Sequence, residues 1–410
     1  MRRNRKLREL KDKILSERTI SFQDRKRLLK QKIKQRYEPI NDKKTQVEIK
    51  PEIDPPKKFK FLSFSDYKPQ NKYRIAHVIE SLGLGGAQTQ LFEISNAFKK
   101  YYKDNTENTV VLLSKSDNGK SGFLNSYNVS YEHVHPNNAK EYFNNKFDIV
   151  LHYRISQSSC IKKYLSQKTK YVLTNTTINN LSKMGYFLNC DAYVTVCQSL
   201  HNQTAFPSSI SKSKRFVVLN GVENDFVASI EPQTLLNGFV TGRCQRLVPG
   251  KFKSDSLTWL ATHAVKSIPD FYHYVIGTNK EAKNIAKKQD CIIYCGSLSD
   301  RNKKLSFIKA FDMYFYETFR HEGASMSVLE SLSCGVPVLC SNYGGNKELV
   351  KDGINGFVCT DRSSFLKKMI YYYKNREQLE LLKESVKRDF NDRLHIKHVC
   401  SKYMQIFDYC

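Results

Sequence analysis

The sequence predicts an α/β fold: two doubly wound units, each built on a parallel sheet, preceded by a basic helical extension. Short apolar runs alternate with helix-sized segments from residue 71 onward, which is typical of parallel sheets. Glycines follow several of these runs, at the strand ends where such sheets bind ligands. Residues 1–70 hold 22 Lys and Arg against 10 Asp and Glu, which sets them apart from the rest of the 410-residue chain. Two domains and an extension also fit this length.

Residues 1–70 are predicted to form a basic helical extension and a linker. Residues 1–36 favour one or two weakly amphipathic helices, whose apolar positions are Leu7, Leu10, Ile14, Leu28, Leu29 and Ile33. Five prolines between residues 39 and 69 indicate an extended linker. The basic helices suit an anionic membrane surface or a docking partner. A solvated, fraying arm fits equally well, and nucleic acid is the least favoured partner.

Composition excludes several classes of protein. No window approaches the about 18 apolar residues of a membrane span, and the first residues are too charged for a secretory signal. Eleven cysteines without a C-x-x-C pair indicate reduced thiols instead of a disulfide framework or a zinc site. The net charge of +27 favours anionic partners. We expect a cytoplasmic protein, peripheral at the inner face of the cell membrane.

The first α/β unit is predicted to span residues 71–235. A strand over residues 74–80 leads into a glycine-rich turn with Gly83, Gly85 and Gly86, and a helix follows from about Thr89 to Tyr101. Glycines in this place let backbone N–H groups approach a ligand at the helix N-terminus. The G-x-G-G spacing differs from the dinucleotide-binding pattern. Further strands are predicted over residues 109–113, 147–152, 171–174, 192–196 and 216–219.

The second α/β unit is predicted to span residues 236–385. Its strands are predicted to begin near Phe239 and to include residues 274–277, 291–296, 336–340 and 357–359. Helices follow from Ser364 onward, and we expect the last one, residues 386–410, to pack back on the first unit.

Two glutamates eight positions apart mark the most informative stretch of this unit. Glu322 precedes a predicted helix and Glu330 lies inside it, about two turns on. Gly335 follows the helix, where a residue with positive φ is easily accommodated. A helix N-terminus can receive an anion, so the stretch could hold a phosphorylated, hydroxyl-rich ligand. An ordinary helix with surface glutamates fits the spacing equally well.

Five segments stand in order along residues 72–410. They are residues 77–88 with Gly85-Gly86, residues 218–222 with Asn220-Gly221, the pair Arg246 and Lys251, the pair Glu322 and Glu330, and residues 334–338 followed by Gly344-Gly345. Together they resemble the motifs of family-4 glycosyltransferases (glycosyl transferases group 1). The resemblance implies the GT-B fold, in which two Rossmann-like domains face each other across an interdomain cleft. The first domain would bind the acceptor and the second the nucleotide-sugar donor.

The resemblance also implies roles for individual residues. Arg246 and Lys251 would hold the donor diphosphate, where cations stabilise the charge that develops on the leaving group; Lys253 could substitute for Lys251. Glu322 would lie near the sugar and the phosphates, and Glu330 would accept hydrogen bonds from the ribose. The sugar and diphosphate would also contact the backbone of Gly323, Ala324, Ser325 and Met326. The base would lie at Gly296 and Ser297. The phosphates or the acceptor would lie at Gly85 and Gly86.

The chain departs from the family pattern at three places. Ala324-Ser325 stands where the family commonly has Phe-Gly, and Gln88 stands where a glutamate is common. A histidine often found at the end of a first-domain strand has no clear match; His152 and residues 174–176 are the candidates nearby. A lone histidine beside an apolar run is more often structural.

The resemblance implies a retaining, metal-independent glycosyltransferase. It would move a sugar, with a hexose expected, from a nucleotide-diphosphate-sugar to a hydroxyl of a glycan or lipid-linked acceptor, in cell-envelope polysaccharide or glycolipid synthesis. No Asp-x-Asp motif follows a predicted strand, and neither a metal nor a further cofactor is expected. The alternative is a non-catalytic binding or scaffold protein on a degenerate fold, which Ala324, Gln88 and the unmatched histidine favour.

Overall fold

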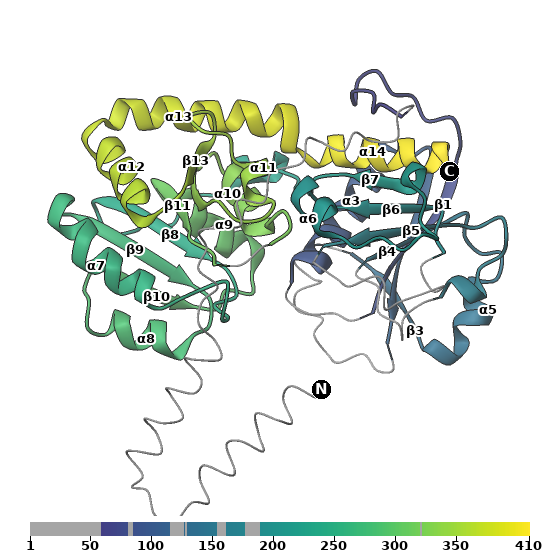
Figure 1. Ribbon diagram of the computed structural model, residues 1–410, viewed down its shortest axis with the longest axis horizontal. Coiled ribbons are helices and arrows are strands. Elements are labelled where there is room, and N and C mark those ends of the chain that lie inside the picture. Colours follow the sequence, from purple (N-terminus) through teal and green to yellow (C-terminus); the bar gives the residue numbers. More distant parts are fainter. Residues whose placement is uncertain are drawn as a thin grey trace, which may run out of the picture. The chain divides into compact units, whose positions relative to one another are not determined.

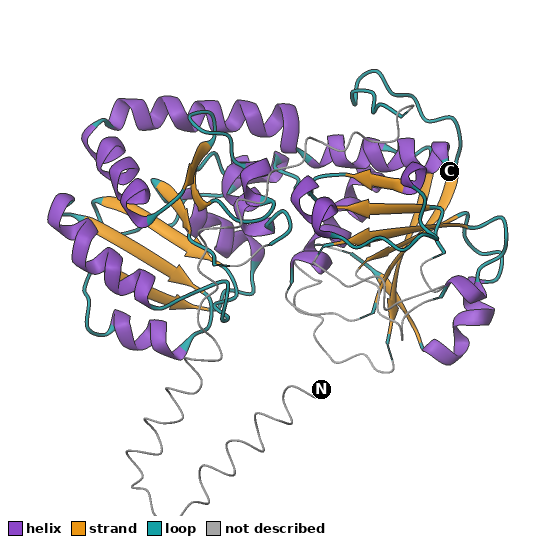
Figure 2. Ribbon diagram, viewed as in Figure 1, coloured by secondary structure: helices purple, strands orange, loops and turns teal. Residues whose placement is uncertain are grey.

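The computed structural model describes residues 59–80, 85–114, 127, 129–153, 161–176, 189–319 and 322–410. All of them belong to one compact unit, residues 55–410. The helices predicted within residues 1–36 and the linker up to residue 58 lie outside the described residues. The described unit contains two parallel sheets with helices around them, which confirms the predicted α/β class with two Rossmann-like sheets (Figures 1 and 2).

The first sheet has seven strands in the order β3-β2-β1-β4-β5-β6-β7, and every neighbouring pair is parallel. The strands are β1 (Tyr73–Ile79), β2 (Thr106–Leu113), β3 (Tyr131–Val134), β4 (Ile149–Tyr153), β5 (Lys170–Asn175), β6 (Ala192–Thr195) and β7 (Arg215–Val217). The order reverses direction at β1, whose two neighbours are β2 and β4. Such a switch point leaves space for a ligand beyond the carboxyl end of the strand, where Gly85 and Gly86 follow β1.

Both faces of the first sheet are covered, because the strand residues point alternately to two apolar clusters. Ile75 and Ile79 of β1 pack with α3 (Gly86–Tyr101) and α14 (Ile396–Tyr409). Ala76 and Val78 pack on the opposite face with Phe143 of α5 (Ala139–Phe143). The short helices η1 (Pro136–Asn138), η2 (Lys162–Tyr164), α6 (Gln198–Gln203), η5 (Lys212–Lys214) and η6 (Asp225–Ser229) connect the remaining strands.

The second sheet has six strands in the order β10-β9-β8-β11-β12-β13, again all parallel. The strands are β8 (Phe239–Cys244), β9 (Phe271–Ile276), β10 (Ile292–Gly296), β11 (Met313–Tyr316), β12 (Val338–Ser341) and β13 (Gly356–Cys359). Its switch point lies at β8 and β11, so the loops that follow these two strands lie at the edge where a ligand is expected.

Helices cover both faces of this sheet as well. One face packs against α7 (Asp255–Ser267), α8 (Lys280–Ala286), α12 (Arg362–Lys374) and α13 (Arg376–Asp389). The other packs against α9 (Arg301–Lys309), α10 (Met326–Ser333) and α11 (Asn346–Leu349). A π-helical turn, η7 (Phe390–Leu394), joins α13 to α14. None of the helices in the described ranges combines the length and apolar character needed to cross a membrane.

The last helix of the chain belongs to the core of the first sheet. Val399, Tyr403 and Phe407 of α14 are buried in the same cluster as β1 and α3, and Figure 1 shows α14 (yellow) beside this sheet. Residues 59–72 cover α14 in turn: the Gln405 amide exchanges two hydrogen bonds with the backbone of Leu62, at 2.8 and 3.1 Å.

The structure differs from the sequence-based expectations at some elements. The strands β3 and β11 lie outside the predicted ones. Helix α3 begins at Gly86, three residues before the expected Thr89, with Gly85 as an extended N-cap. Helix α10 has eight residues and includes Glu330, and Gly335 follows it with a φ of 75°, in the place where the sequence suggested a positive φ.

Candidate functional site

The loop before α10 is fixed by side chains from both halves of the described unit. Asn220, which follows β7, donates a hydrogen bond of 2.8 Å from its amide to the carbonyl of Ala324. Asn346 of α11 accepts one of 3.3 Å from the backbone N–H of Ser325. Ser325 is the N-cap of α10, and no acidic residue lies in the first turn. The partial positive charge at the N-terminus of α10 is therefore not compensated by a carboxylate of its own first turn, and it favours binding of an anion.

Glycines permit the close packing of this loop. Gly344 has a φ of 62°, and a Cβ there would collide with the carbonyl oxygen of Glu322. Gly345 donates a hydrogen bond of 2.9 Å to the same carbonyl. A Cβ on Gly323 would lie 2.8 Å from the carbonyl oxygen of Thr176, which follows β5 of the first sheet. The loop is thus packed against both the segment after β12 and the first sheet.

Lys251 forms an ion pair with Glu322 in this loop. Its Nζ lies 2.6 Å from Oε2 of Glu322, and the two side chains are 23% and 10% exposed. Lys253, the predicted substitute, lies with its Nζ 4.2 Å from the ring centre of Phe319. Arg246 is exposed, and no ion pair of its side chain is found in the described part of the chain. Of the three cations, only Lys251 contacts a predicted site glutamate.

The glycine turn of the first sheet faces this loop. A Cβ on Gly86 would lie 3.4 Å from Cγ of Met326, the first residue of α10. Gly85 and Gly86 open α3, whose first turn also carries no acidic residue. Two helix N-termini, from the two sheets, therefore approach each other at Gly86 and Met326, and both favour a negatively charged ligand.

Glu330 lies in the middle of α10 and is paired with a lysine that sequence reasoning did not single out. Nζ of Lys304, on α9, lies 2.5 Å from Oε1 of Glu330. Arg301 lies one turn before Lys304 and forms an ion pair with Glu93 of α3. Burial raises the pKa of Glu93 to about 7, although Arg301 opposes this change. The only sequence signal for these cations was their i, i+3 spacing on one helix face.

The remaining predicted site residues lie apart from these contacts. Gly296 ends β10 with a φ of 70° and accepts a hydrogen bond of 2.7 Å from Gly277, while Ser297 is exposed. His152 is fully buried in β4, and its Nδ1 lies 2.8 Å from the hydroxyl of Tyr171. Burial lowers the pKa of His152 to about 3. A neutral histidine enclosed in the sheet has no surface to offer a substrate.

One group of side chains in the described ranges has metal-ligand character. Ligand atoms of Glu223, Asp225 and His395 lie within 4.8 Å of one another. Lys100 already forms ion pairs with both carboxylates, and the hydroxyl of Tyr101 donates a hydrogen bond of 2.8 Å to Glu223. Because both carboxylates already have Lys100 as a partner and Glu223 also accepts from Tyr101, we assign no metal to this group.

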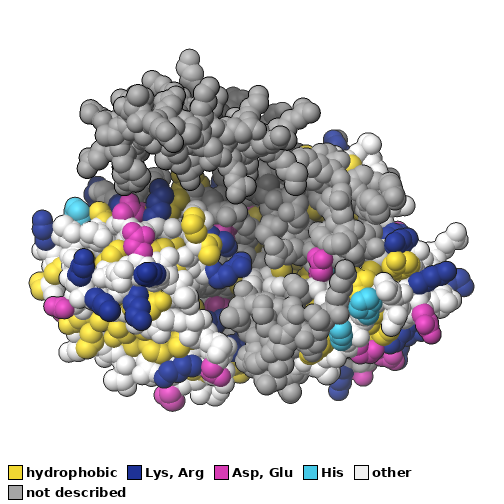
Figure 3. Space-filling view, turned by 90° about the horizontal axis from the view of Figure 1, so that it is seen from below, with side chains coloured by type: hydrophobic (Ala, Val, Ile, Leu, Met, Phe, Trp, Pro, Cys, Tyr) yellow, Lys and Arg dark blue, Asp and Glu magenta, His cyan; other side chains and the backbone are white. Residues whose placement is uncertain are grey.

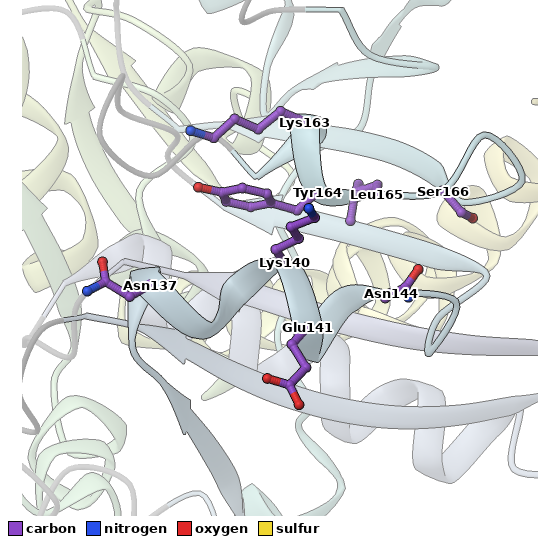
Figure 4. Close-up of a pocket in the computed structure, with 8 residues that line it drawn as sticks. All are labelled: Asn137, Lys140, Glu141, Asn144, Lys163, Tyr164, Leu165 and Ser166. Carbon is purple, nitrogen blue, oxygen red and sulfur yellow. The ribbon is translucent and has the colours of Figure 1, made fainter.

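A cavity of about 450 Å³ lies elsewhere on the first half of the unit and shares no residue with the predicted site. It is lined by Asn137, Lys140, Glu141, Asn144, Lys163, Tyr164, Leu165 and Ser166. Figure 4 shows the Tyr164 ring between Lys140 and Lys163, with Glu141 pointing away. On the face seen in Figure 3, Lys and Arg side chains are scattered over the described surface instead of gathering in one stripe.

Comparison with known proteins gives consistent matches. Residues 245–389 match the family model described as Glycosyl transferases group 1. The chain is 28% identical over 118 residues to the uncharacterized glycosyltransferase MJ1069 of Methanocaldococcus jannaschii; the match spans 28% of this chain and only 30% of that protein. It is 24% identical over 250 residues to the O-antigen biosynthesis glycosyltransferase WclY of Escherichia coli, which covers 58% of this chain and 67% of WclY.

A solved structure has the same arrangement of two sheets. The crystal structure of Anabaena Alr3699/HepE in complex with UDP-glucose matches with a TM-score of 0.65 at 14% identity. The match covers 82% of this chain and all of that one. The described unit therefore has the GT-B fold.

Proposed function

We propose that this chain, which belongs to the glycosyl transferases group 1 family, transfers a sugar from a nucleotide-diphosphate-sugar to a hydroxyl group. One observation carries the proposal: the ion pair of Lys251 and Glu322 lies directly before the N-terminus of α10, opposite Gly86 of α3. A diphosphate placed there would meet the ammonium of Lys251 and backbone N–H groups of α10. Arg246 is exposed and would turn toward the diphosphate when a donor binds.

The proposed reaction proceeds with retention and without a metal ion. The bond between the anomeric carbon and the diphosphate oxygen breaks, and the acceptor oxygen forms its bond to the same face of the sugar. The proton of the acceptor hydroxyl passes to the leaving diphosphate. Lys251 and Arg246 stabilise the charge on that diphosphate, as cations preorganised around a leaving group do.

The proposed substrates follow from the relatives. HepE was crystallised with UDP-glucose and WclY is named for O-antigen synthesis, which supports a UDP-linked hexose as donor and a cell-envelope glycan or glycolipid as acceptor. The basic residues 1–36 would hold the enzyme at an anionic membrane surface, where such acceptors lie.

A donor screen tests the proposal. The full chain is incubated with UDP-, GDP- and ADP-sugars, and release of the nucleoside diphosphate is measured. We expect one donor to be turned over, and Lys251→Ala to reduce its turnover by about 100-fold, the effect of removing one preorganised charge-stabilising group. Lys280→Ala removes an exposed lysine on α8 and should leave turnover unchanged.

Two outcomes would count against the enzyme. If no nucleotide or nucleotide-sugar raises the melting temperature of the chain, the non-catalytic scaffold is favoured. If a donor is turned over and Lys251→Ala behaves as the wild type, the reaction stands but the placement of the diphosphate at Lys251 is wrong.

A further inference from the structure

Lys304 is a largely buried lysine whose ammonium is bonded to a predicted donor-binding residue. Its side chain is 16% exposed and that of Glu330 is 6% exposed. Burial alone would lower the pKa of Lys304, but the carboxylate of Glu330 outweighs it and the pKa is raised. Buried ion pairs of this kind stabilise a fold no more than apolar side chains of the same volume would. Stability therefore does not explain why two charges are enclosed here.

The ion pair with Lys304 leaves one oxygen of the Glu330 carboxylate available to a ligand. Oε1 accepts the hydrogen bond from Lys304, and no hydrogen bond to Oε2 is found within the described ranges. Each carboxylate oxygen can accept two hydrogen bonds. Because Nζ holds Oε1, the carboxylate cannot rotate freely, and Oε2 keeps one direction.

Lys304 is itself held in place by the helix that carries it. Asp300 caps α9 by accepting a hydrogen bond of 2.6 Å from the backbone N–H of Lys303. One turn before Lys304, the Arg301 guanidinium lies between the rings of Tyr127 and Phe226, at 4.4 and 4.3 Å from their centres. The same guanidinium is paired with Glu93 of the first sheet's α3. The first turn of α9 is thus fixed from both sheets.

We propose that Lys304 is a positioning residue for donor binding: its ammonium orients the carboxylate of Glu330 so that Oε2 accepts hydrogen bonds from the ribose hydroxyls of the donor. The proposal rests on the function proposed above, and it adds a cation that acts on the nucleoside instead of the diphosphate. Lys304 touches Glu330 and not the reacting atoms, so it sets donor affinity and leaves the chemical step alone.

Deoxynucleotides test the proposal. Calorimetry with the full chain gives the dissociation constants of UDP, GDP and ADP, and then of the 2′-deoxy and 3′-deoxy forms of whichever binds most tightly. In the wild type we expect one of the deoxy forms to bind about 10- to 100-fold more weakly, the effect of losing a hydrogen bond to a charged group. The ribonucleotide should bind Lys304→Met about 10-fold more weakly than it binds the wild type. The deoxy form should bind Lys304→Met at most about 2-fold more weakly than the ribonucleotide binds the same variant.

A neighbouring lysine supplies the matched control. Lys303 lies on the same helix, is exposed, and contacts the side chain of Gln233. Lys303→Met should keep the wild-type affinities and the wild-type penalty for the deoxy form. In steady-state assays Lys304→Met should raise the KM for the donor and leave kcat within about 2-fold, because orientation of the ribose is shared by ground state and transition state.

Folding of the variant does not limit the test. If Lys304→Met leaves an unpaired buried carboxylate and does not fold, the double variant Glu330→Gln with Lys304→Met removes both charges. Compared with Glu330→Gln alone, it should bind the ribonucleotide with the same affinity, since Lys304 acts only through Glu330.

The outcomes separate the two proposals. If none of the three nucleotides binds the wild type, the proposed function fails and Lys304 loses its role with it. If a nucleotide binds but its deoxy forms bind equally well, or if Lys304→Met keeps the full wild-type penalty, the assignment of Lys304 is overturned while the proposed function stands.

Discussion

At the scale of single residues, burial decides which side chains can act on a ligand. Glu322 and Lys251 keep part of their surface at the start of α10, whereas His152 has none. The resemblance to the family's motifs predicted roles for Glu322, Glu330 and Lys251, because each motif lies within one short stretch of the chain. It could not identify Lys304, because its partner lies 26 positions away and only the packing of α9 on α10 brings them together.

His152 should make the protein sensitive to acid. Its pKa is lowered from 6.5 to about 3 by burial, so below pH 6.5 the unfolded chain binds a proton that the folded chain does not. The free energy of unfolding therefore falls as the pH drops, by about 2 kcal/mol between pH 7 and pH 5 from this residue. Urea unfolding of the wild type and of His152→Asn at several pH values measures it, and the variant should lack this part of the fall.

An exposed histidine gives the comparison. His133 lies exposed in β3, and His133→Asn should follow the wild-type pH dependence. Equal pH dependence of His152→Asn and the wild type between pH 5 and pH 7 would show that His152 is not held neutral in the folded protein.

At the scale of elements, the two halves of the unit are joined through helix ends. Glu348 of α11 accepts hydrogen bonds from the backbone N–H groups of Gln198 and Ser199 at the start of α6, both at 2.6 Å. These N–H groups have no partner within their own helix, and a carboxylate there also compensates the helix dipole. The contact lies beside Asn346 and Gly345, which hold the loop of Glu322.

Glu348→Ala should therefore weaken both the fold and the site. Loss of two hydrogen bonds to a charged group costs about 3 kcal/mol in the free energy of unfolding, and the loosened α11 should also lower nucleotide affinity. Urea unfolding and calorimetry measure the two effects. Glu384→Ala removes an exposed glutamate of α13 that pairs with Lys387, and it should change neither quantity. A Glu348→Ala protein as stable as the Glu384→Ala protein would contradict this account.

The strands that the sequence did not predict are explained at the same scale. Strand β11 reads Met313-Tyr314-Phe315-Tyr316, and all four side chains are buried because β8 and β12 flank it and helices cover both faces. A run buried on both faces has no alternation to distinguish it from a buried helix segment. Strand β3 was not predicted for a different reason: it lies at the edge of the sheet, and two of its four side chains are exposed, so it has no continuous apolar run.

At the scale of the whole molecule, the order of motifs along the chain was enough to predict two Rossmann-like sheets. The residues that join them could not be predicted, since Asn220 and Ala324, or Glu93 and Arg301, meet only once both sheets have formed.

We expect truncations to separate two functional parts of the N-terminal extension, residues 1–58 and residues 59–71. A chain that begins at residue 59 keeps every described contact and should keep its nucleotide affinity and its melting temperature within about 2 °C. It should lose binding to liposomes that contain anionic lipid, while the full chain should bind them in a salt-dependent manner and ignore neutral liposomes. Binding of the full chain to duplex DNA in preference to anionic liposomes would overturn the membrane assignment.

A chain that begins at residue 72 should be less stable. It lacks Phe59, whose ring lies 4.7 Å from that of Tyr409, and Tyr67, which is buried and bonded to Asp408. Exposing this aromatic surface should cost about 3 kcal/mol and lower the melting temperature by about 5 to 10 °C. Equal melting temperatures for the chains that begin at residues 59 and 72 would show that the segment only rests on the surface.

The position of α14 has a consequence for synthesis of the protein. Ribosomes make the strands of the first sheet well before α14, yet Val399, Tyr403 and Phe407 of α14 complete the apolar core of this sheet. The nascent first half must wait with an apolar face exposed until α14 (Ile396–Tyr409) has left the ribosome. A premature stop codon anywhere before residue 396 would therefore damage the half of the protein that had already been made, and proteolysis would remove it.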